Sequence, residues 1–249
     1  MERWQNKVIV VTGASSGIGT AVVKDLLQAG LVVVGLARRY ERMIALRNSL
    51  PVEQQPRFHP LRCDVSNEED VRHVFEWVDN NLGGTDILVN NAGVAKGDIC
   101  LITPDNTAPI RETIETNVMG VVHCTREAFK SMKKRNFDGH ILIVNSVSGH
   151  SIWNFMNNGR FSFNMYAPSK FAITAMTATY RQEFAIAGTK VKITSISPGL
   201  VDTEIISDTL REKPMLQPED ISSAILFAIS TPPHVQIHEL TIKPVGEAW

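Results

Sequence analysis

The sequence is poor in cysteine. Its 249 residues include only Cys63, Cys100 and Cys124. Their odd number, their wide spacing and the lack of a C-x-x-C pair indicate neither a disulfide framework nor a zinc or other metal site. Buried, small apolar thiols in a reducing compartment are the expectation that fits this pattern.

An excess of charge of one sign is also missing. Lys and Arg total 25 and Asp and Glu total 26, for a net charge of −1. A nucleic-acid partner is not indicated, because such proteins carry a basic patch or stripe. No apolar run approaches the roughly 20 residues that span a bilayer, and the first residues lack the pattern of a signal peptide. We therefore expect a cytoplasmic protein without a membrane span.

The chain does contain regularly alternating apolar runs and helical segments. With 43% hydrophobic residues and no low-complexity linker, it suits one domain over 1–249. Continuous β-branched runs indicate strands buried on both faces, as in a parallel sheet. The alternation predicts an α/β class, a three-layer Rossmann fold with a doubly wound parallel sheet of about seven strands. The expected strands are 8–11, 31–36, 58–61, 86–89, 141–144, 191–196 and 237–242.

A glycine-rich turn, T-G-A-S-S-G-I-G over 12–19, follows the first expected strand and opens a helix. Strand, turn and helix are the context that a dinucleotide site requires. Gly13 permits the tight turn, Gly17 lets the backbone approach a pyrophosphate, and Gly19 allows close contact of helix and strand. The helix N-terminus attracts phosphate. The alternative is an ordinary glycine-rich turn, since the spacing differs from G-x-G-x-x-G.

The second expected strand ends at Ala37, and Arg38 and Arg39 follow. An NAD-selective protein of this fold places an acidic residue near this position for the ribose 2′-hydroxyl. Here an alanine stands in that place, and guanidinium groups suit a 2′-phosphate. We therefore predict NADP(H) as the cofactor. The alternative is that both arginines only begin a solvated helix.

Two further strand ends carry polar residues. Asp64 follows the third strand, where its carboxylate can accept a hydrogen bond from adenine or act in a turn or helix cap. The fourth strand leads into N-N-A-G over 90–93. The paired amides of Asn90 and Asn91 can connect adjacent loops, while Ala92 and Gly93 leave room for a ribose. By itself, N-N-A-G also suits a plain turn.

Polar residues also occur in and after the long helical region expected at 105–135. Asn117 is a poor helix former, and it either is exposed or holds a water inside the domain. Ser146 follows the fifth strand, at the sheet edge where ligands bind in open α/β folds, and can donate a hydrogen bond to a substrate oxygen. His150 has no orienting partner nearby in sequence and is interpreted as structural or adjacent to substrate.

Tyr166 and Lys170 are four positions apart, which places them on one face of an expected helix to about residue 187. A fixed ammonium favours the phenolate and is expected to lower the tyrosine pKa from about 10. The pair can then work as an acid/base near neutral pH. Taken alone, the spacing equally suits a solvated helix face.

Two loops complete the candidate site. Segment 151–165 mixes large apolar side chains with Asn and Gly without a regular period, so it can line an apolar pocket, contribute to the core or form a subunit contact. After the sixth strand, Val201 can offer its backbone to a nicotinamide carboxamide and Thr203 can bind a phosphate. The polar segment 204–216 is a candidate mobile lid, and substrate loops are expected near 151–165 and 203–217.

Taken in order, these motifs resemble those of the short-chain dehydrogenase/reductase family over almost the whole chain. They are T-G-A-S-S-G-I-G, D-V, N-N-A-G, Asn117, Ser146, Y-A-P-S-K and S-P-G-L-V-x-T. A closer resemblance, to insect farnesol dehydrogenase-like enzymes and to the group called dehydrogenase/reductase SDR family member 11, rests on M-E-R-W at 1–4, N-S-V-S-G-H at 145–150, R-Q-E at 181–183 and S-T-P-P-H-V-Q-I at 230–237.

The resemblance implies roles for individual residues. Tyr166 would be the acid/base, and Lys170 would lower its pKa and bind the nicotinamide ribose. Ser146 would hold the substrate oxygen, and Asn117 would anchor a water in a proton relay. The implied cofactor-binding residues are Gly13, Ser15, Ser16, Gly17, Ile18, Gly19, Arg38, Arg39, Asp64, Val65, Asn91, Ala92, Gly93, Tyr166, Lys170, Pro198, Gly199, Val201 and Thr203.

One spacing departs from the family pattern, in which the serine commonly lies about a dozen residues before the tyrosine. Ser146 lies twenty before Tyr166, and Ser148 is nearer to the usual spacing. We prefer Ser146, because it follows the strand as the family's serine does and the extra residues fit the 151–165 loop.

The resemblance implies an NADP(H)-dependent alcohol dehydrogenase/carbonyl reductase that interconverts an apolar alcohol, a farnesol-like terpenoid being favoured, with its aldehyde or ketone. The alternatives are a reductase of ketosteroids or small carbonyls, a lyase or epimerase, and a non-catalytic NADP(H)-binding regulator. A homodimer or homotetramer, formed through the helices expected at about 105–135 and 165–187, is a further family expectation.

Overall fold

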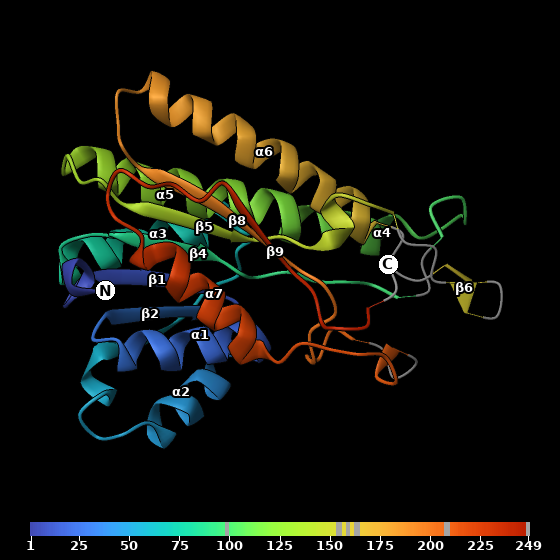
Figure 1. The fold of residues 1–249 in the computed structure, drawn as a ribbon, viewed down its shortest axis with the longest axis horizontal. Coiled ribbons are helices and arrows are strands. Elements are labelled where there is room, and N and C mark those ends of the chain that lie inside the picture. The colour runs from blue at the N-terminus through green and yellow to red at the C-terminus, as the bar shows by residue number, and fades with distance from the viewer. Residues whose placement is uncertain (98–99, 153–155, 158–159, 162–164, 207–209, 248–249) are drawn as a thin grey trace.

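A parallel sheet forms the centre of the molecule (Figure 1). The computed structural model describes residues 1–97, 100–152, 156–157, 160–161, 165–206 and 210–247. Seven of the described strands pair in the order β3-β2-β1-β4-β5-β8-β9, each parallel to its neighbour. They are β1 (Val8–Thr12), β2 (Val32–Ala37), β3 (Phe58–Arg62), β4 (Ile87–Asn90), β5 (His140–Val144), β8 (Lys192–Pro198) and β9 (Glu239–Ile242).

Helices cover both faces of the sheet, so the fold has three layers. The α-helices are α1 (Gly17–Gln28), α2 (Tyr40–Ser49), α3 (Glu68–Leu82), α4 (Thr107–Ile114), α5 (Gly120–Lys134), α6 (Tyr166–Ile186) and α7 (Pro218–Ser230). Short 3₁₀ turns are η1 (Glu2–Trp4), η2 (Gln55–Arg57) and η4 (Val147–Gly149). Helices α1, α2 and α7 lie on one face, and α5 and α6 lie on the other (Figure 1). The predicted Rossmann architecture is confirmed.

The central strand β1 shows why this sequence forms a sheet covered on both faces. All five of its residues are buried, and alternate side chains point to opposite faces. Ile9 and Val11 enter one core, with α1, α2 and α7, whereas Val8 and Val10 enter the other, with α3, α5 and α6. Full burial of such a side chain contributes roughly 1.5–3 kcal/mol. A strand that is buried on both faces, as β1 is, therefore requires a continuous apolar run.

The strand order reverses between β1 and β4. From β1 the chain passes through α1 to β2 on one side, and β4 with its successors extends the sheet on the other side. In open α/β sheets this reversal opens a crevice at the carboxyl ends of the strands, where ligands bind. The loops after these two strands are the ones that carry the glycine-rich turn and N-N-A-G.

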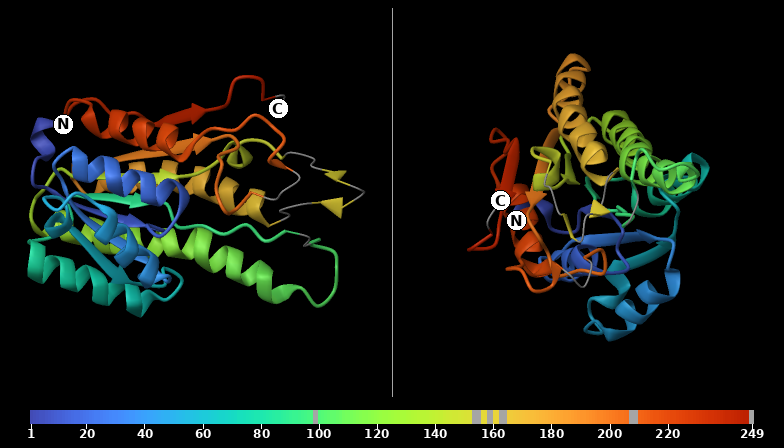
Figure 2. Two further views of the ribbon diagram at one scale, coloured as in Figure 1. Left: turned by 90° about the horizontal axis from the view of Figure 1, so that it is seen from below. Right: turned by 90° about the vertical axis from the view of Figure 1, so that its right-hand side faces the viewer.

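Two segments differ from the sequence-based expectation. The helical region expected at 105–135 is divided by a π-helical turn, η3 (Glu115–Met119), between α4 and α5. The segment 151–165 contains two short antiparallel strands, β6 (Met156–Asn157) and β7 (Arg160–Phe161), and its other large apolar residues mostly lie outside the described residues. These strands lie at the end of the molecule opposite the N-terminus (Figure 1, Figure 2).

The expectation for the cysteines is confirmed at two of three positions. Cys63 and Cys124 are buried, whereas Cys100 is half-buried. Burial raises the pKa of Cys63 to about 12, and it raises that of Cys124 as well. These two thiols are therefore unreactive at neutral pH, because the thiolate is the nucleophile. Within the described part of the chain, no helix has both the length and the apolar character needed to cross a membrane.

Candidate functional site

The glycine-rich turn joins β1 to α1 in a conformation that needs glycine. Gly13 and Gly17 have φ angles of +67° and +50°, in the left-handed region that other residues adopt at a cost. A Cβ on Gly13 would lie 2.9 Å from the Cα of Ala92, and one on Gly19 would lie 2.2 Å from the carbonyl oxygen of Gly13. The turn and the first helical residues therefore lie tightly against the neighbouring loop, as the motif predicts.

Hydrogen bonds connect this turn to the loop after β4. The Thr12 hydroxyl accepts from the backbone N–H groups of Asn91 and Ala92, both at 2.9 Å, and the Asn91 side-chain amide donates to the Thr12 carbonyl at 2.9 Å. The Asn90 amide donates instead to Thr125 Oγ1 of α5 at 3.0 Å. The predicted connection between the two loops is thus present through Asn91, while Asn90 anchors its loop to a helix.

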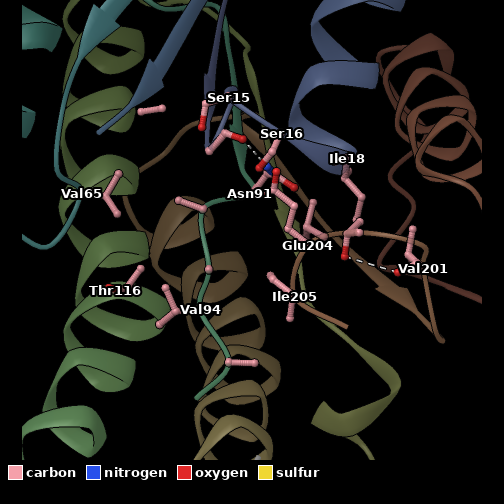
Figure 3. Close-up of a pocket in the computed structure, with 18 of the residues that line it drawn as sticks. Ser15, Ser16, Ile18, Val65, Asn91, Val94, Thr116, Val201, Glu204 and Ile205 are labelled. Carbon is pink, nitrogen blue, oxygen red and sulfur yellow. Dashed lines mark hydrogen bonds between the residues drawn. The ribbon is translucent and has the colours of Figure 1, made fainter. Parts of the chain in front are cut away.

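A cavity of about 450 Å³ lies at the carboxyl ends of the central strands. Val65, Val94 and Thr116 lie on one side of it, and Ile18 and Val201 lie on the other (Figure 3). All but one of the predicted cofactor-binding residues line it: Gly13, Ser15, Ser16, Gly17, Ile18, Arg38, Arg39, Asp64, Val65, Asn91, Ala92, Gly93, Tyr166, Lys170, Pro198, Gly199, Val201 and Thr203. The exception is Gly19, whose position serves close contact with Gly13.

Several lining residues were not among the sequence-based candidates. They are Leu36, Ala37, Cys63, Val94, Ala95, Lys96, Thr116, Val144, Asn145, Glu204, Ile205 and Ile206. Most of them adjoin a predicted residue, so extending each motif by two or three positions would have found them. Glu204 directly follows the predicted Thr203, but its ion pairs with arginines of another segment could not be read from this position.

Arg38 and Arg39 diverge in the structure. Arg39 lies against the glycine-rich turn, where its Nη2 donates to Ser16 Oγ at 2.6 Å and its Nε donates to Ser15 Oγ at 3.3 Å. Arg38 Nη1 lies 4.0 Å from Asp64 Oδ2. A second, smaller cavity adjoins the first and is lined by Arg38, Arg39, Tyr40, Glu41 and Arg62. Guanidinium groups therefore surround the end of the site where the sequence predicts a 2′-phosphate.

Asp64 has the turn role that the sequence left open. Its Oδ1 accepts from the backbone N–H of Ser66 at 3.1 Å and from the Ser66 hydroxyl at 2.7 Å. Asn67, rather than Asp64, caps α3, because its side-chain oxygen accepts from the first N–H groups of that helix. Asp64 also lines the cavity, so a contact with adenine stays a prediction.

The residues predicted to be catalytic meet at one place. The side chain of Ser146 lies close enough to the Tyr166 hydroxyl to influence its pKa. Lys170 Nζ donates to the Val144 carbonyl at 2.8 Å and lies 5.5 Å from the centre of the Tyr166 ring. All three side chains line the cavity, Ser146 from the end of β5 and the other two from the first turns of α6. Tyr166 and Lys170, four positions apart on α6, thus face the cavity and not solvent.

The expected lowering of the Tyr166 pKa is wrong for the protein alone. Burial raises the pKa of Tyr166 above its usual 10.0, and the side chain of Ser146 only partly opposes this. Burial also lowers the pKa of Lys170 to about 8. Removing a charged form from water penalises it, whichever sign it carries, and this penalty exceeds the effect of the neighbouring ammonium. The lysine remains mostly charged at pH 7.

Asn117 is buried, with 2% of its surface exposed, which contradicts the alternative of an exposed residue. Its amide group donates to the Val94 carbonyl at 2.9 Å and accepts from the Val94 N–H at 2.8 Å. The same amide nitrogen lies 3.1 Å from Ser169 Oγ of α6. Asn117 belongs to the π-helical turn, a conformation frequent at functional sites. Asn117 thus connects the turn before α5 to the loop after β4 and to α6.

Ser146, and not Ser148, lies in the cavity with Tyr166. Ser148 contributes its backbone N–H, which donates to Ser146 Oγ at 3.1 Å. His150 has an orienting partner after all, because its Nε2 lies 2.6 Å from Glu239 Oε1 on β9. The same carboxylate oxygen accepts from the Ser197 hydroxyl at 2.5 Å. His150 is thus held outside the cavity, between η4 and the last strand.

Comparisons with known proteins agree with this geometry. A family model described as "short chain dehydrogenase" matches residues 7–214. A farnesol dehydrogenase of Aedes aegypti is 53% identical over the full length of both chains. Mouse dehydrogenase/reductase SDR family member 11 is 39% identical, over 99% of this chain and 97% of its own.

Solved structures share the architecture at lower sequence identity. The closed form of a serine dehydrogenase complexed with NADP⁺ superimposes with a TM-score of 0.86, at 28% identity over 97% of this chain and 96% of its own. An alcohol dehydrogenase from the archaeon Thermococcus sibiricus, complexed with 5-hydroxy-NADP, gives a TM-score of 0.83 at 27% identity over 97% of each chain. The protein belongs to the short-chain dehydrogenase/reductase family and is an oxidoreductase of that family.

Proposed function

We propose that this protein is an NADP(H)-dependent alcohol dehydrogenase/carbonyl reductase, which interconverts an apolar alcohol and its aldehyde or ketone. The observation that carries the proposal is the placement of Ser146, Tyr166 and Lys170 in one cavity with the glycine-rich turn and two arginines. This arrangement joins an acid/base to a dinucleotide-binding turn. A small-molecule carbonyl or alcohol is the substrate class that needs both.

The residues present fit an NADP molecule. The backbone of the turn and the N-terminus of α1 suit the pyrophosphate, and Arg38 and Arg39 suit the 2′-phosphate. Asn91, Val201 and Thr203 also line the cavity. When bound, the nicotinamide supplies the hydride acceptor or donor.

The protein's own residues provide the proton and the orientation. Ser146 holds the substrate oxygen beside the Tyr166 hydroxyl, which gives up or receives the proton. The Lys170 ammonium stabilises the phenolate form of Tyr166, whose pKa burial otherwise raises. Asn117 holds a water in a proton relay to Lys170.

An apolar substrate is favoured by the character of the cavity. Val94, Ile205 and Ile206 add apolar side chains to the polar cofactor site. A farnesol-like terpenoid is our preferred substrate, because the relative with 53% identity is named a farnesol dehydrogenase. Reduction of ketosteroids or small carbonyls is the alternative. The cytoplasmic location, the single domain over 1–249 and the homodimer or homotetramer stay predictions from the sequence and the family.

The test is turnover of wild-type protein with a panel of farnesol, retinal and a ketosteroid, followed through NADPH absorbance. We expect the highest kcat/KM with farnesol and NADP⁺. Tyr166→Phe should reduce turnover by at least about 100-fold, since it removes the acid/base, while NADPH binding is retained.

Tyr180→Phe is the matched control. Tyr180 lies on the same helix but stacks on Phe184, with ring centres 5.8 Å apart, outside the cavity. Near-normal turnover of Tyr166→Phe would refute the assignment. A wild-type protein that binds NADPH but converts none of the substrates would instead favour a non-catalytic regulator, and conversion without net cofactor turnover would favour a lyase or epimerase.

A further inference from the structure

An acidic residue occupies the arginine end of the cofactor site. Glu204 Oε2 accepts from Arg39 Nη1 at 2.7 Å, and Glu204 Oε1 accepts from Arg42 Nη1 at 2.6 Å. Glu204 follows β8, whereas the two arginines lie just after β2, 165 and 162 positions earlier in the chain. The ion pairs therefore connect the segment after β8 with the residue before α2 and with the first turn of α2, and Glu204 itself lines the cavity (Figure 3).

Arg39 is the centre of this network. It also donates to Ser15 and Ser16 of the glycine-rich turn, so its guanidinium group faces both a phosphate-binding turn and a carboxylate. Hydrogen bonds from Arg39 and Arg42 hold the pKa of Glu204 below its usual value. Glu204 is consequently anionic at neutral pH, and it uses the guanidinium donors that a phosphate would use.

The ion pairs are placed where they can open. The side chains of Arg39, Arg42 and Glu204 are 47%, 49% and 55% exposed. Exposed pairs are individually weak and are screened by salt. A phosphate group carries more negative charge than a carboxylate and forms charge-assisted hydrogen bonds with guanidinium groups. A phosphate can therefore displace Glu204 from the arginines. Breaking the ion pairs of Glu204 lowers the net affinity of the protein for that phosphate.

We infer that Glu204 is a cofactor-selectivity residue, which competes with the 2′-phosphate of NADP(H) for Arg39 and is held in that position by Arg42. Glu204 thereby weakens the binding of 2′-phosphorylated nucleotides and has little effect on nucleotides with a free 2′-hydroxyl. The inference rests on the proposed NADP(H) site. The inference also predicts that NADP(H) binding moves Glu204 away from Arg39.

Calorimetric titration with adenosine 2′,5′-bisphosphate and with adenosine 5′-monophosphate isolates the 2′-phosphate from the catalytic residues. We expect Glu204→Gln to lower the dissociation constant of the bisphosphate about three- to tenfold and to change that of the monophosphate less than twofold. Titration with NADP⁺ and NAD⁺ should show the same contrast. In the Arg39→Ala background, the effect of Glu204→Gln should shrink.

Glu212→Gln is the matched control. Glu212 is exposed on the same connection to α7, and no ion pair of Glu212 is found among the described residues. It makes the same change in net charge, and it should leave both dissociation constants unchanged. An equal effect of Glu212→Gln would attribute the gain to general electrostatics and would overturn the inference.

The remaining outcomes separate the inference from the function on which it rests. Suppose that the wild-type protein prefers the bisphosphate but Glu204→Gln binds the bisphosphate no more tightly than wild type does. This result overturns the competition by Glu204 and leaves the NADP(H) proposal intact. A wild-type protein without that preference refutes the NADP(H) proposal. In that case, a preference for the bisphosphate that appears in Glu204→Gln supports competition by Glu204. If Glu204→Gln shows no such preference, the competition is overturned as well.

Discussion

At the scale of single residues, Ser146 and Ser148 give the clearest contrast. Ser146 lies in the cavity with Tyr166, whereas Ser148 contributes a backbone N–H. We expect Ser146→Ala to lower kcat by about 100-fold or more, the size typical of losing one positioned hydrogen-bond donor. Ser148→Ala keeps the backbone donor and should retain kcat within about twofold.

Steady-state kinetics of both variants, with the NADPH dissociation constant measured in parallel, check this prediction. The cofactor should bind to both variants as it does to wild type, because neither hydroxyl belongs to the phosphate-binding turn. A larger loss in Ser148→Ala than in Ser146→Ala would show that the usual spacing to the tyrosine, and not the position after the strand, marks the functional serine.

At the residue scale, the sequence predicted positions that depend on neighbours in the chain. Gly13 and Gly17 of the turn and the Tyr166–Lys170 pair follow from local spacing, and the structure places them at one cavity. Glu204 and its arginine partners could not be paired this way, since they are more than 160 positions apart. The pKa of Tyr166 was also missed, because burial is a property of the folded protein.

At the scale of elements, the start of β8 holds a buried ammonium group. Lys192 Nζ donates to Thr231 Oγ1 at 3.1 Å and to the carbonyls of Pro232 and Val235 at 3.3 and 2.9 Å. It thus fastens the connection from α7 to β9 against the sheet. Burial, with a smaller effect of Arg3, lowers the pKa of Lys192 from 10.5 to about 8.

This lowered pKa gives a prediction with a defined sign. Between about pH 8 and pH 10.5 the unfolded chain keeps the proton that folded Lys192 has lost, so Lys192 makes stability rise with pH in that window. Lys192→Met removes this contribution. Relative to wild type, the free energy of unfolding of Lys192→Met should therefore fall as the pH rises from 8 to 10.

Urea denaturation at several pH values measures this difference. Lys190→Met is the control, since Lys190 is exposed just before the strand and should give a curve parallel to that of wild type. Parallel curves for Lys192→Met and wild type would mean that the ammonium group is not affected by burial.

The regular elements were predictable from sequence because a buried parallel strand leaves a continuous apolar run. All seven strands of the described sheet overlap the expected ranges. The π-helical turn and the β6–β7 pair were not foreseen. A π turn has no compositional pattern of its own and depends on packing, and strands of two residues are too short to show alternation.

At the scale of the whole molecule, the cavity joins loops from β1, β2, β3, β4, β5 and β8. A ligand bound there should stabilise the entire fold by mass action, by about 2.7 kcal/mol at 100 times its dissociation constant. For a chain of this size, that corresponds to a rise in Tm of roughly 5–10 °C. We expect NADP⁺ to raise Tm more than NAD⁺ does at equal concentration.

Thermal unfolding with increasing concentrations of either nucleotide checks the order. An equal or larger shift with NAD⁺ would contradict the choice of NADP(H) that Ala37, Arg38 and Arg39 indicate. The comparison needs no substrate, so it tests the choice of cofactor separately from the choice of alcohol.

The π-helical turn at Glu115–Met119 has a consequence for chain length. Successive residues of an α-helix are rotated by roughly 100° about its axis. Inserting one residue into a regular α-helix would therefore rotate α4 by that angle relative to α5, unless a wider turn takes up the residue, as this π turn does. Thr113, which is 1% exposed, thereby keeps its buried position on α4 while Asn117 forms its two bonds to Val94. Deleting one residue from the turn should consequently change the turn and the bonds of Asn117, and should leave α4 in its present orientation.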